Sequence, residues 1–512
     1  MPVKLDSQTT ILILTAGLLA FIWLFLTTTY GPGVSPDSTV YIETAENLIA
    51  GKGFYASGEP LTHYPPLYPL LLAIAKIAIP DTLLAGRWLH AFLFAINVML
   101  VATAIYIFTK HRSLLPIGGA IILFLASTPI LITHTMAWSE SPFITFSLAG
   151  LILLALYISK PSLSLLLISS FMFGLAVATR YVGLVLLCPL LFGVLILNQK
   201  PFREKIQHAL LAMVVALTPV GLWLLRNTLV AESATNRQFT PHLVEWRHLA
   251  DLVNTLSDFV LPLAAPIWIK VAHVTLLLLL FVVILRQFYR AYLSEKPIES
   301  GNAAFVSLNL VYILSYTAFL LVSISFFDAH TPLDSRVLLP VYISLILIAV
   351  LVVSHLVSKW QRPISRLSLF FFFSLIVILN GTYAVRETSY IQQNGLGYTS
   401  QMWRASPTIN AINSLEDTVK VYSNGTDVLS FLTRKEAATI PYRTFPATLE
   451  KNANYQRELI YLCQEISYGN AKLVFFHNIN RWYLMEEVEF ELACHDTNII
   501  RLQDGTIYRQ TR

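Results

Sequence analysis

Four charged residues that lie far apart along the chain are the strongest candidates for chemistry: Asp37, Glu140, Arg180 and Arg336. Each stands near a point where a long apolar stretch begins or ends. A carboxylate can take a proton from a hydroxyl group as a general base. The planar guanidinium group of arginine matches the oxygens of a phosphate. These residue types therefore predict a site for an anionic headgroup and a hydroxyl nucleophile.

The composition identifies the elements that must position these residues. The chain has 512 residues, of which 55% are hydrophobic and only 13% are charged, whereas soluble domains carry about 25% charged residues. Long apolar runs predict helices, because a bilayer offers no water to an open backbone. We expect a polytopic α-helical membrane protein with about eleven transmembrane helices. They are placed near residues 11–30, 86–108, 115–133, 141–159, 162–179, 181–197, 208–230, 271–289, 303–325, 336–357 and 368–386.

Basic residues are distributed unevenly among the loops between these helices. Loops on the side of the N-terminus contain twelve: Lys110, Arg112, Lys160, Lys200, Arg203, Lys205, Arg286, Arg290, Lys296, Lys359, Arg362 and Arg366. The opposite loops contain seven: Lys52, Lys76, Arg180, Arg237, Arg247, Lys270 and Arg336. The positive-inside rule places the N-terminus in the cytoplasm and the segment after the last helix outside. The net charge of +5 is thus explained by topology, and no nucleic-acid partner is indicated.

Residues 31–83 form a long first outer loop. Within it, the helical spacing of apolar residues from Val40 to Ala50, followed by Gly51, predicts an amphipathic helix lying on the membrane. Residues 66–79 are apolar but too few to span. We therefore expect one interfacial helix in this loop, followed by a second helix that is either interfacial or re-entrant.

From residue 387 the composition becomes that of a soluble domain. Alternation at Val419–Tyr422, an apolar run at Ala471–Phe476 and the turn signal Asp504-Gly505 predict strands and a hairpin. We expect a membrane domain over residues 1–386 and a small extracytoplasmic α/β domain over 387–512. Cys463 and Cys494 either pair there or remain free thiols.

Several short motifs follow one another over about residues 10–390. They are Asp37 with Tyr41, Gly51-Lys-Gly-Phe54, Pro65-Pro-Leu-Tyr-Pro69, Arg87, Ser139-Glu-Ser-Pro-Phe143, Thr179-Arg-Tyr-Val-Gly-Leu184 and Asp334-Ser-Arg-Val-Leu-Leu-Pro340. In their order and spacing the chain resembles the GT-C superfamily of polyprenyl-phosphate-sugar glycosyltransferases. The closest group is the branch related to protein mannosyltransferases and aminoarabinose transferases. The domain after residue 387 shows no such resemblance.

The resemblance implies transfer of a sugar from a polyprenyl-phosphate donor to an acceptor on the outer face of the membrane, with inversion. The partners implied are that donor, membrane lipids, and a lipid, glycan or protein acceptor. The family often has two adjacent acids in the first outer loop, whereas Ser38 follows Asp37 here. This departure weakens an assignment to protein O-mannosylation. Cell-membrane localisation is implied as well.

Asp37 is the expected general base, although aspartate is also a preferred helix N-cap. Glu140 matches the family's second acid and is expected to bind the acceptor, orient the sugar or assist a metal. The alternative is a helix-start acid stabilised by the helix dipole. A divalent metal with His63, His134 or His330 is conceivable, but the spacing of these residues does not support one.

The remaining candidates are expected to bind donor phosphate or substrate. They are Arg180, Arg336, Arg87, Tyr41 and Asp334, with Lys76 and Asp328 as weaker candidates. Arg180 can instead extend to the interface as a structural residue, and Asp334 can simply neutralise Arg336.

Two other classes of protein stay open. A lipid-linked sugar flippase or transporter would have related halves and polar groups near the midplane; the sequence shows neither. A non-catalytic assembly protein would use the outer domain to bind a partner.

Overall fold

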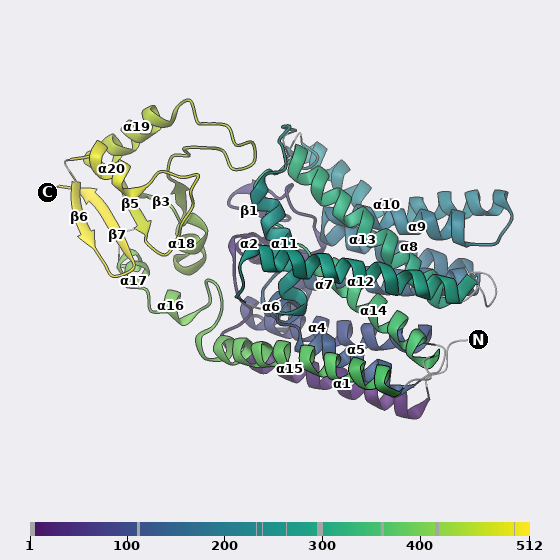
Figure 1. Ribbon diagram of the computed structural model, residues 1–512. Helices are drawn as coiled ribbons and strands as arrows, with labels where there is room; N and C mark the ends of the chain where they lie inside the picture. Colours follow the sequence, from purple (N-terminus) through teal and green to yellow (C-terminus); the bar gives the residue numbers. More distant parts are fainter. Residues whose placement is uncertain are drawn as a thin grey trace.

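The computed structural model describes residues 6–109, 113–231, 233–237, 239–262, 264–293, 301–359, 363–414, 419–495 and 497–511. A bundle of helices carries a small unit with a sheet at one end, and α1 begins at the opposite end (Figure 1). Lys110, Arg112, Lys296 and Arg362, which entered the topology argument, lie outside the described residues.

Eight helices of the described chain are long and apolar enough to cross a membrane. They are α1 (Ser7–Thr27), α4 (Thr82–Phe108), α7 (Glu140–Ser159), α10 (Phe202–Ala231), α12 (Ile267–Leu293), α13 (Gly301–Phe326), α14 (Leu339–Lys359) and α15 (Pro363–Asn394). The multi-pass membrane architecture predicted from the sequence is thus confirmed.

The predicted number of about eleven spanning helices is not confirmed. The predicted helix near 115–133 is a bent pair, α5 (Leu114–Ala126) and α6 (Thr128–Thr135), with 61° between them. Ser127 caps α6 and a proline follows at its start, which explains the break. If this pair counts as one span, the described residues hold nine.

Two further predicted spans are short apolar helices. These are α8 (Leu163–Thr179) and the segment Tyr181–Leu197, which comprises η1 (Tyr181–Leu186), α9 (Leu187–Phe192) and η2 (Gly193–Leu197). Arg180 separates them in an extended conformation, with φ −150° and ψ 130°. The break places the Arg180 side chain at the end of two apolar helices.

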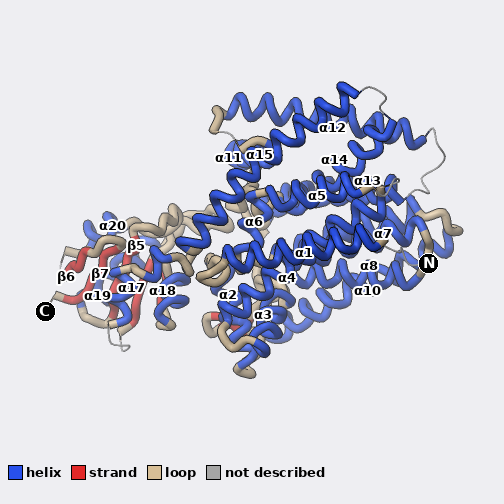
Figure 2. The backbone as a smooth tube through the Cα atoms, turned by 90° about the horizontal axis from the view of Figure 1, so that it is seen from below, coloured by secondary structure: helices blue, strands red, loops and turns tan. Residues whose placement is uncertain are grey.

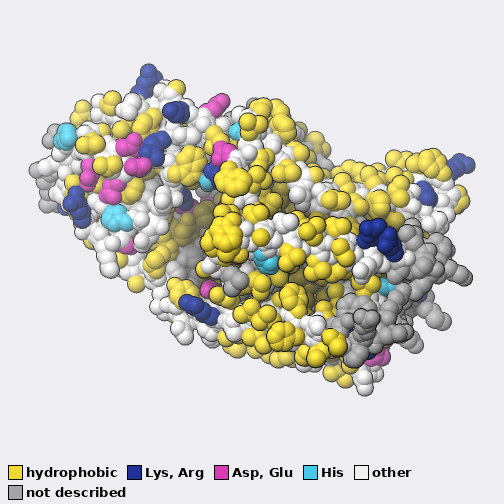
Figure 3. Space-filling model, in the orientation of Figure 1, with side chains coloured by type: hydrophobic (Ala, Val, Ile, Leu, Met, Phe, Trp, Pro, Cys, Tyr) yellow, Lys and Arg dark blue, Asp and Glu magenta, His cyan; other side chains and the backbone are white. Residues whose placement is uncertain are grey.

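Close helix packing forms the core of the bundle. Helix α7 packs on α8, and α1 packs on α4. At Gly150 an added Cβ would lie 2.4 Å from the ring of Phe173, so only glycine permits this approach of α7 and α8. Large apolar side chains are exposed along α12 and α15, and hydrophobic side chains dominate the visible surface of the bundle (Figure 3), as expected of a surface facing lipid.

The segment between α1 and α4 contains two helices at the places where the sequence predicts them. They are α2 (Pro36–Ile49) and α3 (Leu67–Ala78), with the short hairpin β1 (Tyr55–Ala56) and β2 (Glu59–Pro60) between them. Helix α2 starts earlier than predicted, so Asp37 lies in its first turn and Ser35 is the N-cap. The capping interpretation of Asp37 is therefore wrong.

The C-terminal unit is a five-stranded sheet with helices, as Figure 2 shows. The strand order is β4-β3-β5-β7-β6, in which β3 runs parallel to β4 and β5 while β7 is antiparallel to β5 and β6. Cys463 and Cys494 form a disulfide. The elements are α16 (Gln401–Arg404), α17 (Pro407–Asn413), β3 (Lys420–Ser423), α18 (Thr426–Thr433), β4 (Ala437–Thr439), α19 (Tyr455–Ser467), β5 (Ala471–Phe476), α20 (Glu487–Ala493), β6 (Thr497–Arg501) and β7 (Gly505–Gln510).

Candidate functional site

A backbone ladder of three segments brings the candidate residues together. Gly33 pairs in parallel with Met136, and Val34 pairs in parallel with Gly397. The backbone N–H of Ala137 donates to the carbonyl of Gly33 over 2.8 Å. The N–H of Tyr398 donates to the carbonyl of Val34 over the same distance. The ladder therefore joins the chain just before α2, the chain just before α7 and the start of the C-terminal unit.

Gly397 is the position at which this ladder is least tolerant of change. It has φ +60°, and an added Cβ would lie 2.1 Å from the carbonyl oxygen of Val34. We expect Gly397→Ala to lower the free energy of unfolding by more than about 2 kcal/mol, because the strained backbone and the clash act together. Thermal unfolding of the purified protein measures the loss.

Gly51→Ala is the matched control for that substitution. Gly51 has a similar φ of +74°, but nothing lies within 4 Å of its added Cβ. The control therefore carries the backbone strain of about 1 kcal/mol without the clash. Equal losses in the two variants would contradict the ladder.

Arg336 lies between the two candidate carboxylates. Its Nη2 donates to Oδ2 of Asp37 over 2.7 Å, and its Nε donates to Oε1 of Glu140 over 2.5 Å. Nη1 of Arg180 reaches the same Glu140 oxygen at 2.6 Å. Four residues from α2, α7, the α8–η1 break and the turns before α14 thus form one cluster, which we call the acid–arginine cluster.

Burial within the acid–arginine cluster is graded. The Glu140 side chain is 2% exposed, whereas Asp37 is 29% exposed and both arginines are 22% exposed. Oε2 of Glu140 is buried without a hydrogen-bond partner among the described residues. Because buried polar atoms are nearly always satisfied, this oxygen is an acceptor available to a ligand. The opposed charges balance, so an incoming anion must displace a carboxylate from an arginine.

Asp37 is held in its ionised form. Burial raises the pKa of the Asp37 carboxyl, but the Arg336 guanidinium and the Tyr64 hydroxyl outweigh it, so the net pKa is lowered. Burial in turn lowers the pKa of Arg336, but Glu140 and Asp37 outweigh that effect and raise it. The Asp37–Arg336 pair is therefore charged at neutral pH.

This lowered pKa predicts a pH dependence of stability. The ion pair stabilises the fold fully above the unfolded aspartate pKa of about 3.9, and its contribution is lost as the pH falls through the lower folded-state pKa. We expect the melting temperature of the wild type to exceed that of Asp37→Asn by a constant margin above about pH 5 and by a shrinking one below about pH 4. A margin that already shrinks near neutral pH would show that Arg336 does not hold the carboxylate ionised.

Two aromatic residues complete the acid–arginine cluster and were not predicted as site residues. The hydroxyl of Tyr64 donates to Oδ1 of Asp37 over 2.9 Å. The guanidinium carbon of Arg336 lies 4.1 Å from the ring centre of Trp138, a cation–π contact. The signal in the sequence was their position, since Tyr64 opens the Pro65-Pro motif and Trp138 directly precedes Ser139 and Glu140.

Tyr41, another residue predicted to bind the donor or substrate, lies beside the acid–arginine cluster. Its hydroxyl is 3.4 Å from Oγ of Ser139, and Ser139 also accepts a hydrogen bond from Arg180 over 3.2 Å. Its ring packs edge-on against those of Tyr64 and Tyr68. Tyr41 therefore supports the wall of the cluster beside Asp37.

Two other predicted site residues make local contacts instead. Arg87 donates to the carbonyl of Phe25 over 2.9 and 2.6 Å, and so caps the end of α1. Oδ1 of Asp334 accepts from the backbone N–H of Val337 over 2.9 Å, which shapes the turn that presents Arg336. No ion pair joins Asp334 to Arg336 in the described structure.

The histidines are also engaged elsewhere. His134 bonds to Asn97 and to the carbonyl of Ile130 inside the bundle. His330 contacts Arg247 and Trp482, and Asp328 accepts from the N–H of His330. His63 packs against the ring of Tyr64. The part of the chain that the structure describes holds no group of three or more metal-ligating side chains.

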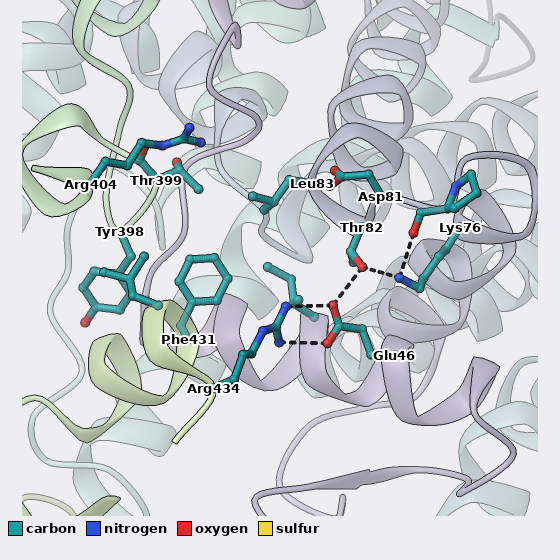
Figure 4. Close-up of a pocket in the computed structure, with 13 residues that line it drawn as sticks. Glu46, Lys76, Asp81, Thr82, Leu83, Tyr398, Thr399, Arg404, Phe431 and Arg434 are labelled. Carbon is teal, nitrogen blue, oxygen red and sulfur yellow. Dashed lines mark hydrogen bonds and ion pairs between the residues drawn. The ribbon is translucent and has the colours of Figure 1, made fainter. Parts of the chain in front are cut away.

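Lys76 lies in a pocket of about 450 Å³ between α2, the α3–α4 turn and the C-terminal unit (Figure 4). Its ammonium donates to Thr82 over 2.7 Å, and Thr82 donates to Glu46 over 2.9 Å. Arg434 completes this chain with two bonds to Glu46, of 2.9 and 3.2 Å. These contacts therefore hold the C-terminal unit against the C-terminal end of α2, the helix that carries Asp37. We call the pocket beside them the docking pocket.

Known proteins share both the fold and part of the sequence. The family model for dolichyl-phosphate-mannose-protein mannosyltransferases matches residues 63–223, a range that includes Glu140 and Arg180. No curated protein sequence matches the chain.

Solved structures give a match over the whole length. The structure of ArnT from Cupriavidus metallidurans bound to undecaprenyl phosphate matches with a TM-score of 0.57 and 12% identity, over 98% of each chain. Its apo state gives 0.56 and 12%, again over 98% of each chain. The S. cerevisiae Pmt1–Pmt2 complex bound to the sugar donor covers 46% of this chain and 35% of that one, at 16% identity and a TM-score of 0.36, too low to establish a shared fold. The chain therefore shares the overall fold of the ArnT structures, and the family-model match over residues 63–223 supports the resemblance predicted from the sequence.

Proposed function

We propose that the protein is a glycosyltransferase that moves a sugar from a polyprenyl-phosphate donor to a hydroxyl group on the outer face of the membrane. The observation that carries the proposal is the placement of Arg336 between Asp37 and Glu140. The match to ArnT bound to undecaprenyl phosphate supports the class of donor. A lipid, glycan or protein acceptor is compatible with this chemistry.

The reaction needs one base and one anion-binding group. The acceptor oxygen attacks the anomeric carbon while the bond from that carbon to the phosphate oxygen breaks. The hydroxyl proton passes to Asp37, and the polyprenyl phosphate leaves with the electron pair. Attack opposite to the leaving group inverts the anomeric configuration.

Arg336 couples donor binding to the activation of Asp37. A phosphate offers the guanidinium group stronger and bidentate hydrogen bonds, so it competes with Asp37 for Nη2. Release of Asp37 from this ion pair raises the carboxyl pKa and makes it a better proton acceptor. Arg180, which shares Glu140 with Arg336, supplies the second positive charge for the leaving phosphate.

Glu140 has a different role from Asp37. Its Oε1 is shared by two arginines, while Oε2 is buried and unpartnered in the described structure. We assign Oε2 to a hydrogen bond from a hydroxyl of the donor sugar, which orients the anomeric carbon toward the acceptor.

The orientation in the membrane is also a proposal. Helix α2, which carries Asp37 in its first turn, lies at the end of the bundle near the C-terminal unit, and α1 begins at the opposite end (Figure 1). The disulfide between Cys463 and Cys494 supports an oxidising compartment for that unit. Together with the basic loops, the disulfide supports a location of the cluster and the C-terminal unit outside the cytoplasm.

The test is a transfer assay in membranes that contain the protein. A polyprenyl-phosphate sugar with a radiolabel in the sugar is added, and both the labelled product and the released polyprenyl phosphate are quantified. We expect the two to form in equal amounts, with an inverted anomeric centre by NMR. Movement of intact labelled lipid across the bilayer without release of polyprenyl phosphate would indicate a flippase instead.

A further inference from the structure

We propose that a second pocket, in the C-terminal unit, binds a carbohydrate that carries no acidic group. This pocket has a volume of about 700 Å³. It lies apart from the acid–arginine cluster and from the docking pocket of Figure 4. The binding of a carbohydrate stands on its own observations. Its role, to hold a glycan acceptor for sugar transfer, rests on the proposed function.

The pocket lies where the sheet topology favours a ligand site. Strand β3 has β4 on one side and β5 on the other, and all three run in parallel. The connections from β3 and β4 therefore leave in opposite directions and open a crevice at the carboxyl ends of β3 and β5. Asn424 directly follows β3, His477 directly follows β5, and both line the pocket.

The floor of the pocket is fixed before any ligand arrives. The Asn424 amide donates to the carbonyls of Phe476 and Ile479, over 2.9 and 3.1 Å, and accepts from the N–H of Phe476 over 2.8 Å. These bonds hold the β5 end and the following loop in place. A preformed site loses little conformational entropy on binding.

The charges that line the pocket exclude anionic ligands. Three glutamates line it, Glu486, Glu487 and Glu491, and Figure 3 shows acidic side chains gathered on the C-terminal unit in the region of α20. Of the two lining arginines, Arg481 is bound to Asp427 at 2.7 Å and Arg501 to Glu491 at 3.1 Å. The pocket therefore attracts neutral hydroxyl or amino groups and repels phosphates and carboxylates.

Trp482 provides the apolar surface that a sugar ring needs. It lines the pocket and is 41% exposed. The C–H face of a pyranose packs on an indole ring, while its hydroxyls bond to carboxylates and amides at the edge. A concave site with one aromatic wall and a few polar groups fits a small polar ligand. Carbohydrate is the chemical class that uses all of these features together.

The same tryptophan connects the pocket to the membrane part. Its indole N–H is 3.4 Å from Nε2 of His330, and the two rings are 5.4 Å apart. His330 precedes Arg336 in the turns before α14. A glycan held against Trp482 is thus kept at the interface of the C-terminal unit with the loop that carries Arg336.

The experiment measures binding to the full-length protein in lipid nanodiscs by saturation-transfer NMR. The probes are chitotriose, mannotriose and a glucosamine trisaccharide, with a sialylated trisaccharide as the acidic comparison. We expect at least one of the first three to bind and the sialylated one not to bind. Trp482→Leu and Glu487→Gln are each expected to weaken binding about tenfold.

Tyr468→Leu is the matched control, since Tyr468 is an exposed aromatic residue of the same unit, 71% exposed, outside the pocket. Trp482→Leu also removes the contact between the C-terminal unit and His330, so a second pocket variant is needed. Glu487 bonds to Tyr508 and His477 within the unit, so Glu487→Gln leaves that contact in place. Failure of all the non-acidic probes to bind, equal binding of the sialylated probe, or unchanged affinity in both pocket variants would overturn the proposal.

The binding measurement tests the carbohydrate pocket, and the transfer assay tests the proposed function, so the two proposals can fail separately. Asp37→Asn is expected to bind the trisaccharide as the wild type does. Binding by a wild type that releases no polyprenyl phosphate would sustain the carbohydrate pocket and refute the transferase. Transfer by a wild type that binds none of the trisaccharides would sustain the transferase and refute the carbohydrate pocket.

Discussion

Asp37→Asn is expected to lower the rate of sugar transfer by about 10²–10⁴-fold, the usual contribution of a general base. Asparagine keeps the shape of the side chain and can still accept from Tyr64, but it cannot take the acceptor proton. The loss is therefore expected in kcat, while the KM for the donor should not rise, because the phosphate no longer competes with a carboxylate for Arg336. Initial rates at several donor concentrations separate the two constants.

Asp81→Asn is the control for this substitution. Asp81 is an acid of the same segment between α1 and α4, where it caps α4 by accepting from the N–H of Leu84 over 2.7 Å. Asparagine is as good a cap as aspartate, so the rate should stay near that of the wild type. Full turnover by Asp37→Asn would remove the assignment of the base.

Arg336→Met is expected to remove transfer and to lower the free energy of unfolding by about 3 kcal/mol, since breaking a buried ion pair leaves a charge without its partner. Glu140, which is 2% exposed, keeps its ion pair with Arg180, whereas Asp37 loses its ion pair with Arg336, so two carboxylates share a single guanidinium group. Unfolding in a denaturant series measures the stability, and the lipid assay measures transfer.

The double variant Arg336→Met with Glu140→Gln separates stability from activity. Neutralising Glu140 restores the charge balance of the cluster, with one carboxylate (Asp37) and one guanidinium group (Arg180), so part of the lost stability should return. Transfer should stay lost, because the guanidinium group for the leaving phosphate is still missing. Recovery of transfer in the double variant would show that Arg336 serves only to neutralise Glu140.

Arg434→Met provides the comparison with an exposed ion pair. Arg434 also bonds to a carboxylate, that of Glu46, but it is 63% exposed. Exposed pairs contribute at most about 1 kcal/mol. A loss as large as that of Arg336→Met would contradict the role of burial in the acid–arginine cluster.

The sequence predicted the members of the acid–arginine cluster because they share a position relative to the membrane. Asp37, Glu140, Arg180 and Arg336 all stand near ends of apolar stretches, and topology alone assigns those ends to one face. The sequence did not predict that Arg336 forms ion pairs with both Asp37 and Glu140. That contact depends on the ladder of Gly33, Met136 and Gly397, which joins segments far apart in the chain.

Other features could not be predicted because they depend on contacts that the sequence does not reveal. The charge of Arg87 suggested a substrate contact, yet its guanidinium group caps α1 at Phe25. The bend between α5 and α6 was missed because the hydropathy of residues 115–133 is continuous across Ser127. Tyr64 and Trp138 resembled ordinary aromatic residues of the membrane interface, and only their three-dimensional partners set them apart.

The most direct measurement is an experimental structure of the protein in nanodiscs with undecaprenyl phosphate. The account predicts phosphate oxygens within hydrogen-bond distance of the Arg336 or Arg180 guanidinium group, with Asp37 released from Arg336. A phosphate bound instead at Lys76, or an Asp37–Arg336 ion pair that persists beside it, would contradict the account.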